Sequence, residues 1–170
     1  MPVTRLRILG LDPGLARMGW GMIEMTGTRL SHIAHGVLTT DAKTGLGPRL
    51  LVLHDLLSGV IARLEPQSIA IEQAFVHKDP SAALKLGQAR AMALLAAARA
   101  GLEIAEYAPN HVKKCVVGVG HASKEQVQAM IRHLLPTARV ESADAADALA
   151  LAIAHAHLSG TRARIQAALT

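Results

Sequence analysis

Cysteine and aromatic residues are the scarcest side chains in this 170-residue chain. Its one cysteine, Cys115, excludes an internal disulfide and a cysteine-based zinc cluster, and it fits a reducing cytoplasm. The aromatic content is limited to Trp20, Phe75 and Tyr107. Apolar residues still make up 51% of the chain, so alanine and leucine must fill the interior, which favours closely packed helices.

Long hydrophobic runs are missing as well. Arg5 and Arg7 interrupt the first apolar stretch, which therefore does not resemble a signal peptide. Residues 86–98 contain Arg90, and residues 148–154 are too few to cross a bilayer. Internal repeats, low-complexity segments and linkers are also absent, so we expect residues 1–170 to form one domain with its own core.

The hydrophobic pattern predicts an α/β fold. Strands are expected at 5–11, 17–26, 29–39, 68–73 and 102–107, and helices at 47–64, 81–100, from the Asn110 cap, at 124–135 and from the Ser142 cap to about 158. Tight links between the first three strands indicate an antiparallel meander. This order predicts a five-stranded mixed sheet flanked by helices on both faces, with 160–170 as a flexible basic tail.

Four acidic residues stand in apolar surroundings. In the stretch "RILGLDPGLARMGWGMIE", Asp12 ends an apolar strand just before Pro13-Gly14. Glu72 ends the buried strand that contains Ile69-Ala70-Ile71. Asp144 and Asp147 lie three residues apart on one face of a helix that has no other formal charge from 143 to 158.

Simpler roles account for some of these acids. Asp before Pro-Gly is ordinary in a turn, and an acid in a first helical turn stabilises the helix dipole, which explains Asp144 alone. Asp147 lies one turn further in, and no basic residue of its own helix lies within a turn of it. A divalent cation explains all four acids, because Mg²⁺ and Mn²⁺ prefer carboxylate oxygens. Zinc is less suited, since the chain has no cysteine cluster and no HxxxH pair.

The charge balance indicates a polyanionic partner. The net charge is +5, and the excess of lysine and arginine is larger still outside the four acids. Lys113 and Lys124 flank the stretch Gly118-Val119-Gly120, whose backbone can approach a phosphodiester closely. For any one lysine, a solvated surface charge is the ordinary alternative.

Five segments together resemble the RuvC family of bacterial Holliday-junction resolvases, in the ribonuclease H-like superfamily. They are "ILGLDPGLARMGWGMIE", "IAIEQAF", "ALKLGQARA", "VKKCVVGVGHASKEQV" and "ADAADALALAIAHAH". The resemblance extends from about residue 5 to 158 in matching order. It implies a ribonuclease H-like fold, a homodimer and Mg²⁺-dependent nicking of two opposed strands of a four-way DNA junction, in recombination and repair. It also implies RuvA and RuvB as partners.

The resemblance assigns roles to individual residues. Asp12, Glu72, Asp144 and Asp147 match the family's catalytic metal ligands, which implies two Mg²⁺ ions per site, with Mn²⁺ as a substitute. Some relatives carry histidine in place of the first acid of the helical pair, so Asp144 implies an all-carboxylate site. The implied products are a 5′-phosphate and a 3′-hydroxyl.

The resemblance also implies DNA-binding residues. The family's two functional lysines match Lys113 and Lys124, and Lys114 lies beside the first of them. Phe75 matches an aromatic residue that follows the glutamate strand, where stacking on an opened base and core packing are both open interpretations.

Other aromatic and apolar residues are expected to serve packing. Trp20 is expected in the sheet, and His155 and His157 in packing or an interface. The helix at 81–100 is a candidate dimer contact, because four alanines and one methionine on it allow close approach; they are Ala89, Met92, Ala93, Ala96 and Ala97.

Three alternatives remain at this point. The Asp12-Pro-Gly turn also resembles the phosphate loop of actin-like kinases and ATPases, but those proteins need two such domains. A ribonuclease H-like nuclease that acts on structured RNA keeps the superfamily and changes the substrate. A junction-binding protein without catalysis is hard to reconcile with four retained carboxylates.

Overall fold

The structure is a computed structural model that describes residues 5–73 and 79–169. Its sheet contains β1 (Arg5–Asp12), β2 (Arg17–Thr26), β3 (Arg29–Thr39), β4 (Ser68–Glu72) and β5 (Ile104–Tyr107). Its helices are α1 (Leu46–Leu64), α2 (Pro80–Arg99), α3 (Pro109–Val117), α4 (Lys124–Leu134) and α5 (Ala143–Leu169).

The strands form one mixed sheet in the order β3-β2-β1-β4-β5. β1, β2 and β3 pair antiparallel, as the short turns between them predict, whereas β1, β4 and β5 pair parallel. Leu11 of β1 is in register with Ile71 of β4, so Asp12 and Glu72 end neighbouring strands at the same edge of the sheet. The predicted five-stranded mixed sheet is confirmed.

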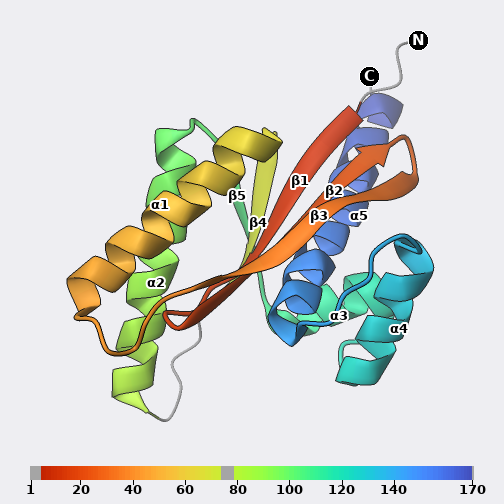
Figure 1. Cartoon of the computed structure of the whole chain (residues 1–170). Coiled ribbons are helices and arrows are strands. Elements are labelled where there is room, and N and C mark those ends of the chain that lie inside the picture. Colours follow the sequence, from red (N-terminus) through yellow and green to blue (C-terminus); the bar gives the residue numbers. More distant parts are fainter. Residues whose placement is uncertain (1–4, 74–78, 170) are drawn as a thin grey trace.

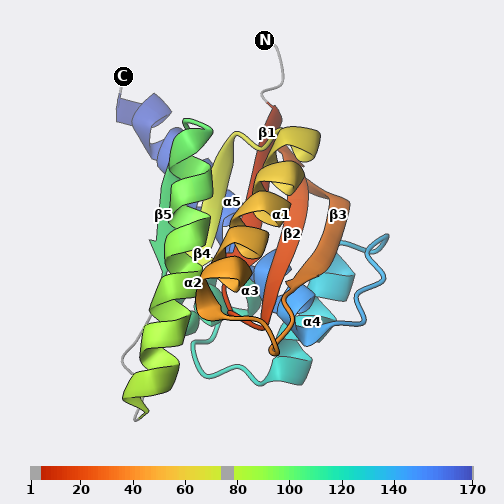
Figure 2. The ribbon, with the colours of Figure 1, turned by 60° about the vertical axis from the view of Figure 1, so that its left-hand side comes forward.

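Helices cover both faces of the sheet. Figures 1 and 2 show α1 and α2 on one face and α3, α4 and α5 on the other. Side chains alternate between the two faces along a strand, so Leu9 joins a core with Leu53 and Ala93, while Ile8 joins a core with Ile153. Two separate hydrophobic cores therefore fix the sheet from opposite sides.

Glycines let α5 lie directly on β1 and β2. Gly10 and Gly21 are cross-strand partners, and Gly19 pairs with Asp12. A Cβ on Gly10 would collide with the backbone of Ala148, and one on Gly19 would collide with the backbone carbonyl of Asp144. The first turns of α5 consequently approach the sheet closely beside the end of β1.

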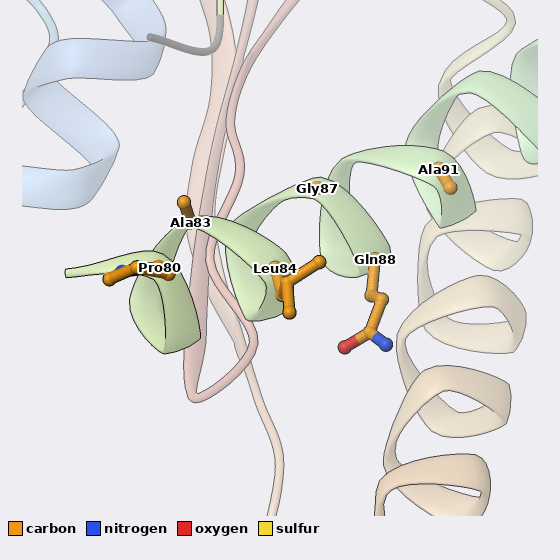
Figure 3. Close-up of a pocket in the computed structure, with 6 residues that line it drawn as sticks. All are labelled: Pro80, Ala83, Leu84, Gly87, Gln88 and Ala91. Atoms are coloured by element: carbon orange, nitrogen blue, oxygen red, sulfur yellow. The ribbon is translucent and has the colours of Figure 1, made fainter. Parts of the chain in front are cut away.

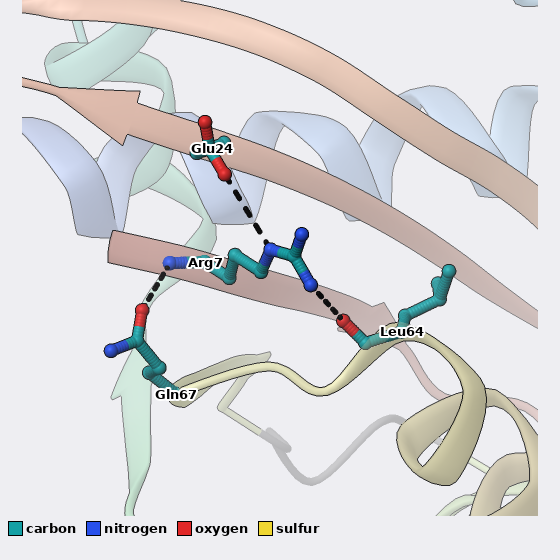
Figure 4. A network of polar contacts seen from close by, with 4 residues as sticks. All are labelled: Arg7, Glu24, Leu64 and Gln67. Atoms are coloured by element: carbon teal, nitrogen blue, oxygen red, sulfur yellow. Dashed lines mark hydrogen bonds and ion pairs between the residues drawn. The ribbon is translucent and has the colours of Figure 1, made fainter. Parts of the chain in front are cut away.

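Arg7 ties α1 to the opposite end of the sheet. Figure 4 shows its guanidinium between Glu24 of β2 and the end of α1, where it donates to the carbonyl oxygen of Leu64 at 3.2 Å. Its backbone N–H donates to Oε1 of Gln67 at 3.0 Å, and the N–H of Gln67 donates back to the carbonyl of Arg7 at 2.9 Å. These contacts direct the chain from α1 into β4, parallel to β1.

Several expected boundaries differ from the structure. Residues 160–169 of the predicted flexible tail are helical instead, because α5 continues to Leu169. Its residues there are mostly good helix formers, and the single Gly160 costs only about 1 kcal/mol in a helix interior. α3 begins at Pro109 rather than after an Asn110 cap, since proline is well suited to the first helical position.

The packing of α2 contradicts the prediction that its alanines form a dimer contact. Ala89, Ala93, Ala96 and Ala97 are buried inside the protomer, so a partner subunit cannot contact them. Trp20 is buried in the sheet, as expected, with the guanidinium of Arg63 5.9 Å from its ring centroid. Within the described part of the chain, no helix has the length and hydropathy needed to span a membrane.

Substitution of Gly19 by alanine tests the close approach of α5. The added methyl group has to push the Asp144 turn away from β2, so we expect a loss of about 1–3 kcal/mol in the free energy of unfolding. Gly59→Ala in α1 is the matched control, because a Cβ there meets nothing within 4 Å. This control should gain about 0.5–1 kcal/mol in urea unfolding. Equal effects of the two substitutions would contradict the predicted contact.

Candidate active site

Three elements bring the four predicted acids to one edge of the sheet. Asp12 and Glu72 end the adjacent parallel strands β1 and β4. Asp144 and Asp147 lie in the first turns of α5, which the glycines hold against β1 and β2. The four residues therefore lie at the same edge of the sheet, and their assignment to a metal site stays a prediction.

The charges of the other acids act on Asp12. Its pKa is raised from 3.8 to about 7, chiefly because burial removes water from the carboxylate. The negative charges of Asp147, Glu72 and Asp144 raise the pKa further, and the positive charge of Lys124 lowers it. Asp12 is thus the centre of a group of like charges.

The pKa of Asp147 is also raised, although this residue is more exposed than Asp12. Although the residue is exposed at the surface, neighbouring protein desolvates its carboxyl and raises its pKa. Asp144 adds to this rise, whereas Lys124 and Lys113 oppose it. Both predicted lysines therefore lie near the carboxylates, Lys113 from α3 and Lys124 from the first position of α4.

Asp144 differs because an arginine holds it. Nε of Arg17, the first residue of β2, donates to Oδ2 of Asp144 at 2.7 Å. Nη2 of Arg17 reaches Oγ of Ser142 at 3.4 Å. The role of Arg17 was not predicted from the sequence; its position five residues after Asp12, across a tight turn, is the signal that could have indicated one.

A second arginine fixes the end of β4. Arg90 of α2 is only 9% exposed, and its Nη1 donates to the backbone carbonyl of Glu72 at 2.9 Å. Its Nη2 forms an ion pair with Oε2 of Glu106 at 2.6 Å. In the sequence, Arg90 interrupts an apolar run and has no evident partner. A charge on a buried, alanine-rich helix face needs partners, and the partners of Arg90 are Glu106 and the backbone carbonyl of Glu72.

The four carboxylates offer the oxygen ligands that hard divalent cations prefer, but their side chains are not arranged around a common point. Within residues 5–73 and 79–169, no three histidine, cysteine, aspartate or glutamate side chains are arranged to hold one metal ion. Asp144 is turned to Arg17 instead. The four acids still offer only oxygen ligands, and their mutual repulsion raises the pKa of Asp12. Positive charge would relieve that repulsion, so the residues fit Mg²⁺ or Mn²⁺ in the chemistry of their donor atoms.

The remaining predicted residues have different placements. Lys114 is exposed, and its charge acts on the thiol of Cys115, whose pKa is raised by burial. Phe75 lies outside the described residues. His155 and His157 are engaged within the protomer: His155 contacts the hydroxyls of Tyr107 at 2.7 Å and Ser68 at 2.9 Å, and His157 contacts the carbonyl of Cys115.

Comparison with known proteins identifies the family of this chain. The family model described as crossover junction endodeoxyribonuclease RuvC matches residues 8–155. The protein of that name from Parvibaculum lavamentivorans is 57% identical over 169 residues, which cover 99% of this chain and 96% of the relative. The one from Cereibacter sphaeroides is 56% identical over 164 residues, with 96% and 97% covered.

Solved structures agree with the sequence relatives. Thermus thermophilus RuvC in complex with a Holliday junction substrate has a TM-score of 0.88 at 30% identity, with 92% of this chain and 96% of that chain covered. The yeast mitochondrial Holliday junction resolvase Ydc2 has a TM-score of 0.65 at 14% identity, which shows a shared fold alone. These neighbours confirm the ribonuclease H-like fold. The chain belongs to the RuvC family of crossover junction endodeoxyribonucleases.

Proposed function

We propose that this chain is an endonuclease that resolves four-way DNA junctions by paired, symmetric nicks in recombination and repair. One observation carries the proposal: Asp12 lies among three other carboxylates with Lys124 close by, at the edge of a ribonuclease H-like sheet. The relatives at 52–57% identity are named crossover junction endodeoxyribonucleases, and one solved neighbour is described with a Holliday junction substrate. No feature of the described residues favours structured RNA instead.

The carboxylates are proposed as the metal ligands of the reaction. Asp12, Glu72, Asp144 and Asp147 would hold two Mg²⁺ ions, or Mn²⁺ in their place. Bound there, such ions neutralise the scissile phosphate, lower the pKa of the attacking water and stabilise the leaving 3′-oxygen. The products would carry a 5′-phosphate and a 3′-hydroxyl.

The protein's own groups would orient the DNA and hold the site in shape. Lys113 and Lys124 bring positive charge beside Asp147 and Asp12, where a phosphodiester must approach four acids that repel it. Arg90 donates a hydrogen bond to the backbone carbonyl of Glu72, which holds this proposed ligand in place at the end of β4. Lys114 and Phe75 remain proposed DNA contacts on the family resemblance alone.

A homodimer is proposed because two opposed strands require two sites. The candidate surface lies on the exposed side of α2, opposite its buried alanines. Figure 3 shows its residues along the first turns of the helix: Pro80, Ala83, Leu84, Gly87, Gln88 and Ala91. Leu84 is 67% exposed and lies beside other apolar residues of this surface. RuvA and RuvB as partners, and a cytoplasmic location, are proposed from the family resemblance.

A synthetic four-way junction tests the activity directly. With Mg²⁺, the protein should nick two opposed strands at symmetric positions, resolved on a denaturing gel, and chelation should abolish the cuts. Asp12→Asn should reduce cleavage by on the order of 10²-fold or more while junction binding persists, because even indirect metal supports are worth about 10–100-fold.

Controls for this experiment separate the alternatives. Asp55→Asn, at an acid of α1 that is 64% exposed, should cut like the wild type. A structured RNA and a linear DNA duplex serve as competing substrates. Preference for the RNA would favour the alternative nuclease, and loss of both binding and cutting in Asp12→Asn would indicate a structural role for this residue.

The raised pKa of Asp12 predicts a pH-dependent stability of the metal-free protein. The folded state holds a proton that the unfolded state releases, so the stabilisation from this group is complete below about pH 3.8 and is lost as the pH rises through about 7. The loss is at most about 1.4 kcal/mol per pH unit. In urea unfolding with a chelator, Asp12→Asn should be more stable than the wild type near pH 8 and similar near pH 4.

Mg²⁺ should reverse this difference. Ligands that bind only the folded state raise the free energy of unfolding, so saturating Mg²⁺ should stabilise the wild type near pH 8 and leave Asp12→Asn much less affected. Asp55→Asn should follow the wild type in both series. An equal response of the wild type and Asp12→Asn to Mg²⁺ would contradict the proposed metal site.

The exposed face of α2 predicts the effect of a charge on assembly. Leu84→Glu should raise the dimer dissociation constant by about tenfold or more in light scattering, because burial of a leucine contributes about 1.5–3 kcal/mol. Ile33→Glu on the edge strand β3 is the control, since Ile33 is also exposed but lies at the other side of the sheet. An unchanged dimer in Leu84→Glu would exclude this surface, and a monomeric wild type would oppose paired cutting.

A further inference from the structure

Arg17 holds a proposed metal ligand in the metal-free protein. Its Nε lies 2.7 Å from Oδ2 of Asp144, within the range of a strong charge-assisted hydrogen bond. Ser142 adds weaker contacts, with Oγ 3.4 Å from Nη2 of Arg17 and 3.5 Å from the same Asp144 oxygen. This oxygen therefore already has a positive partner.

The backbone on both sides fixes the contact. Arg17 is the first residue of β2 and is in register with Thr39 of β3. Two residues further along β2, the bare backbone of Gly19 packs against the backbone carbonyl of Asp144. The backbones of Arg17 and Asp144 are thus held in place by the sheet and by α5. The ion pair therefore follows from how this edge of the sheet is packed.

The same contact is easily exchanged. The Arg17 side chain is 54% exposed and that of Asp144 is 32% exposed, so water screens their attraction. A divalent cation beside Asp144 would meet the guanidinium as a like charge and would need the same carboxylate. Binding of one positive group must therefore oppose binding of the other.

We propose that Arg17 is the resident counter-ion of Asp144 and competes with the divalent cation for this carboxylate. The inference rests on the proposed function, in which Asp144 is a metal ligand. Arg17 is a positioning residue in this scheme: it keeps Asp144 paired while the site is empty and has to release it before the carboxylate ligates metal. Linkage then requires that the free energy by which the Arg17–Asp144 pair stabilises the metal-free site weakens the free energy of metal binding by the same amount.

Titration of Mn²⁺ into the DNA-free protein, followed by calorimetry, tests the competition. Arg17→Gln should bind Mn²⁺ about two- to fivefold more tightly than the wild type, the range that an exposed ion pair allows. Arg29→Gln is the matched control, because Arg29 is an exposed arginine that begins β3 at the opposite end of the sheet. It should leave the Mn²⁺ affinity unchanged, although it removes the same formal charge.

Thermal unfolding distinguishes competition from a merely structural role. With a chelator, Arg17→Gln should unfold at a lower temperature than the wild type, and saturating Mg²⁺ should remove most of the difference. A purely structural arginine would leave the variant less stable in both conditions and would not tighten Mn²⁺ binding. That pair of results would overturn the proposal.

The Arg17 side chain also offers a direct signal. In a ¹H–¹⁵N spectrum, the Nε–H resonance that disappears in Arg17→Gln should shift when Mg²⁺ is added to the wild type, because its carboxylate acceptor is withdrawn. A wild type that binds Mn²⁺ while this resonance stays in place would overturn the Arg17 proposal and leave the nuclease proposal standing. A wild type that binds no Mn²⁺ would overturn both.

Discussion

The close contact between α5 and the first two strands is the constraint on which the site depends. Asp12 and Glu72 reach the same edge through ordinary parallel pairing, but Asp144 and Asp147 belong to a helix far away in the sequence. Gly10 and Gly19 remove the side chains that would keep this helix at its usual distance. Four carboxylates are consequently brought to one end of a rigid sheet, where backbone elements rather than loops carry them.

Such a cluster opposes folding, and the fold contains groups that reduce the cost. Burial and three negative neighbours raise the pKa of Asp12, so that its carboxyl holds a proton at a pH where an ordinary aspartate is charged. Lys113 and Lys124 act on Asp147 from two helices, and Arg17 pairs with Asp144. Positive charge from α3, α4 and β2 therefore offsets part of the repulsion within the cluster.

Local patterns predicted most of the fold because hydrophobic periodicity and turn chemistry act over short stretches. The three-stranded meander, both layers of helices and the five strands were predicted with small boundary differences. The largest difference is the end of α5, which was expected at about residue 158 but lies at Leu169, because good helix formers continue the helix. The alanines of α2 were assigned to a partner subunit because close approach is predictable from small residues, whereas the identity of the approaching surface is not.

The sequence by itself determined the family, the order of the elements and the four acids, since each depends on motifs that are continuous along the chain. The tertiary structure alone decided which charges meet. Arg17 and Asp144, or Arg90 and the backbone of Glu72, are far apart in sequence and become neighbours only when the sheet, α2 and α5 assemble. The pKa of Asp12 has the same origin, because desolvation and charge repulsion depend on distances in space rather than on spacing along the chain.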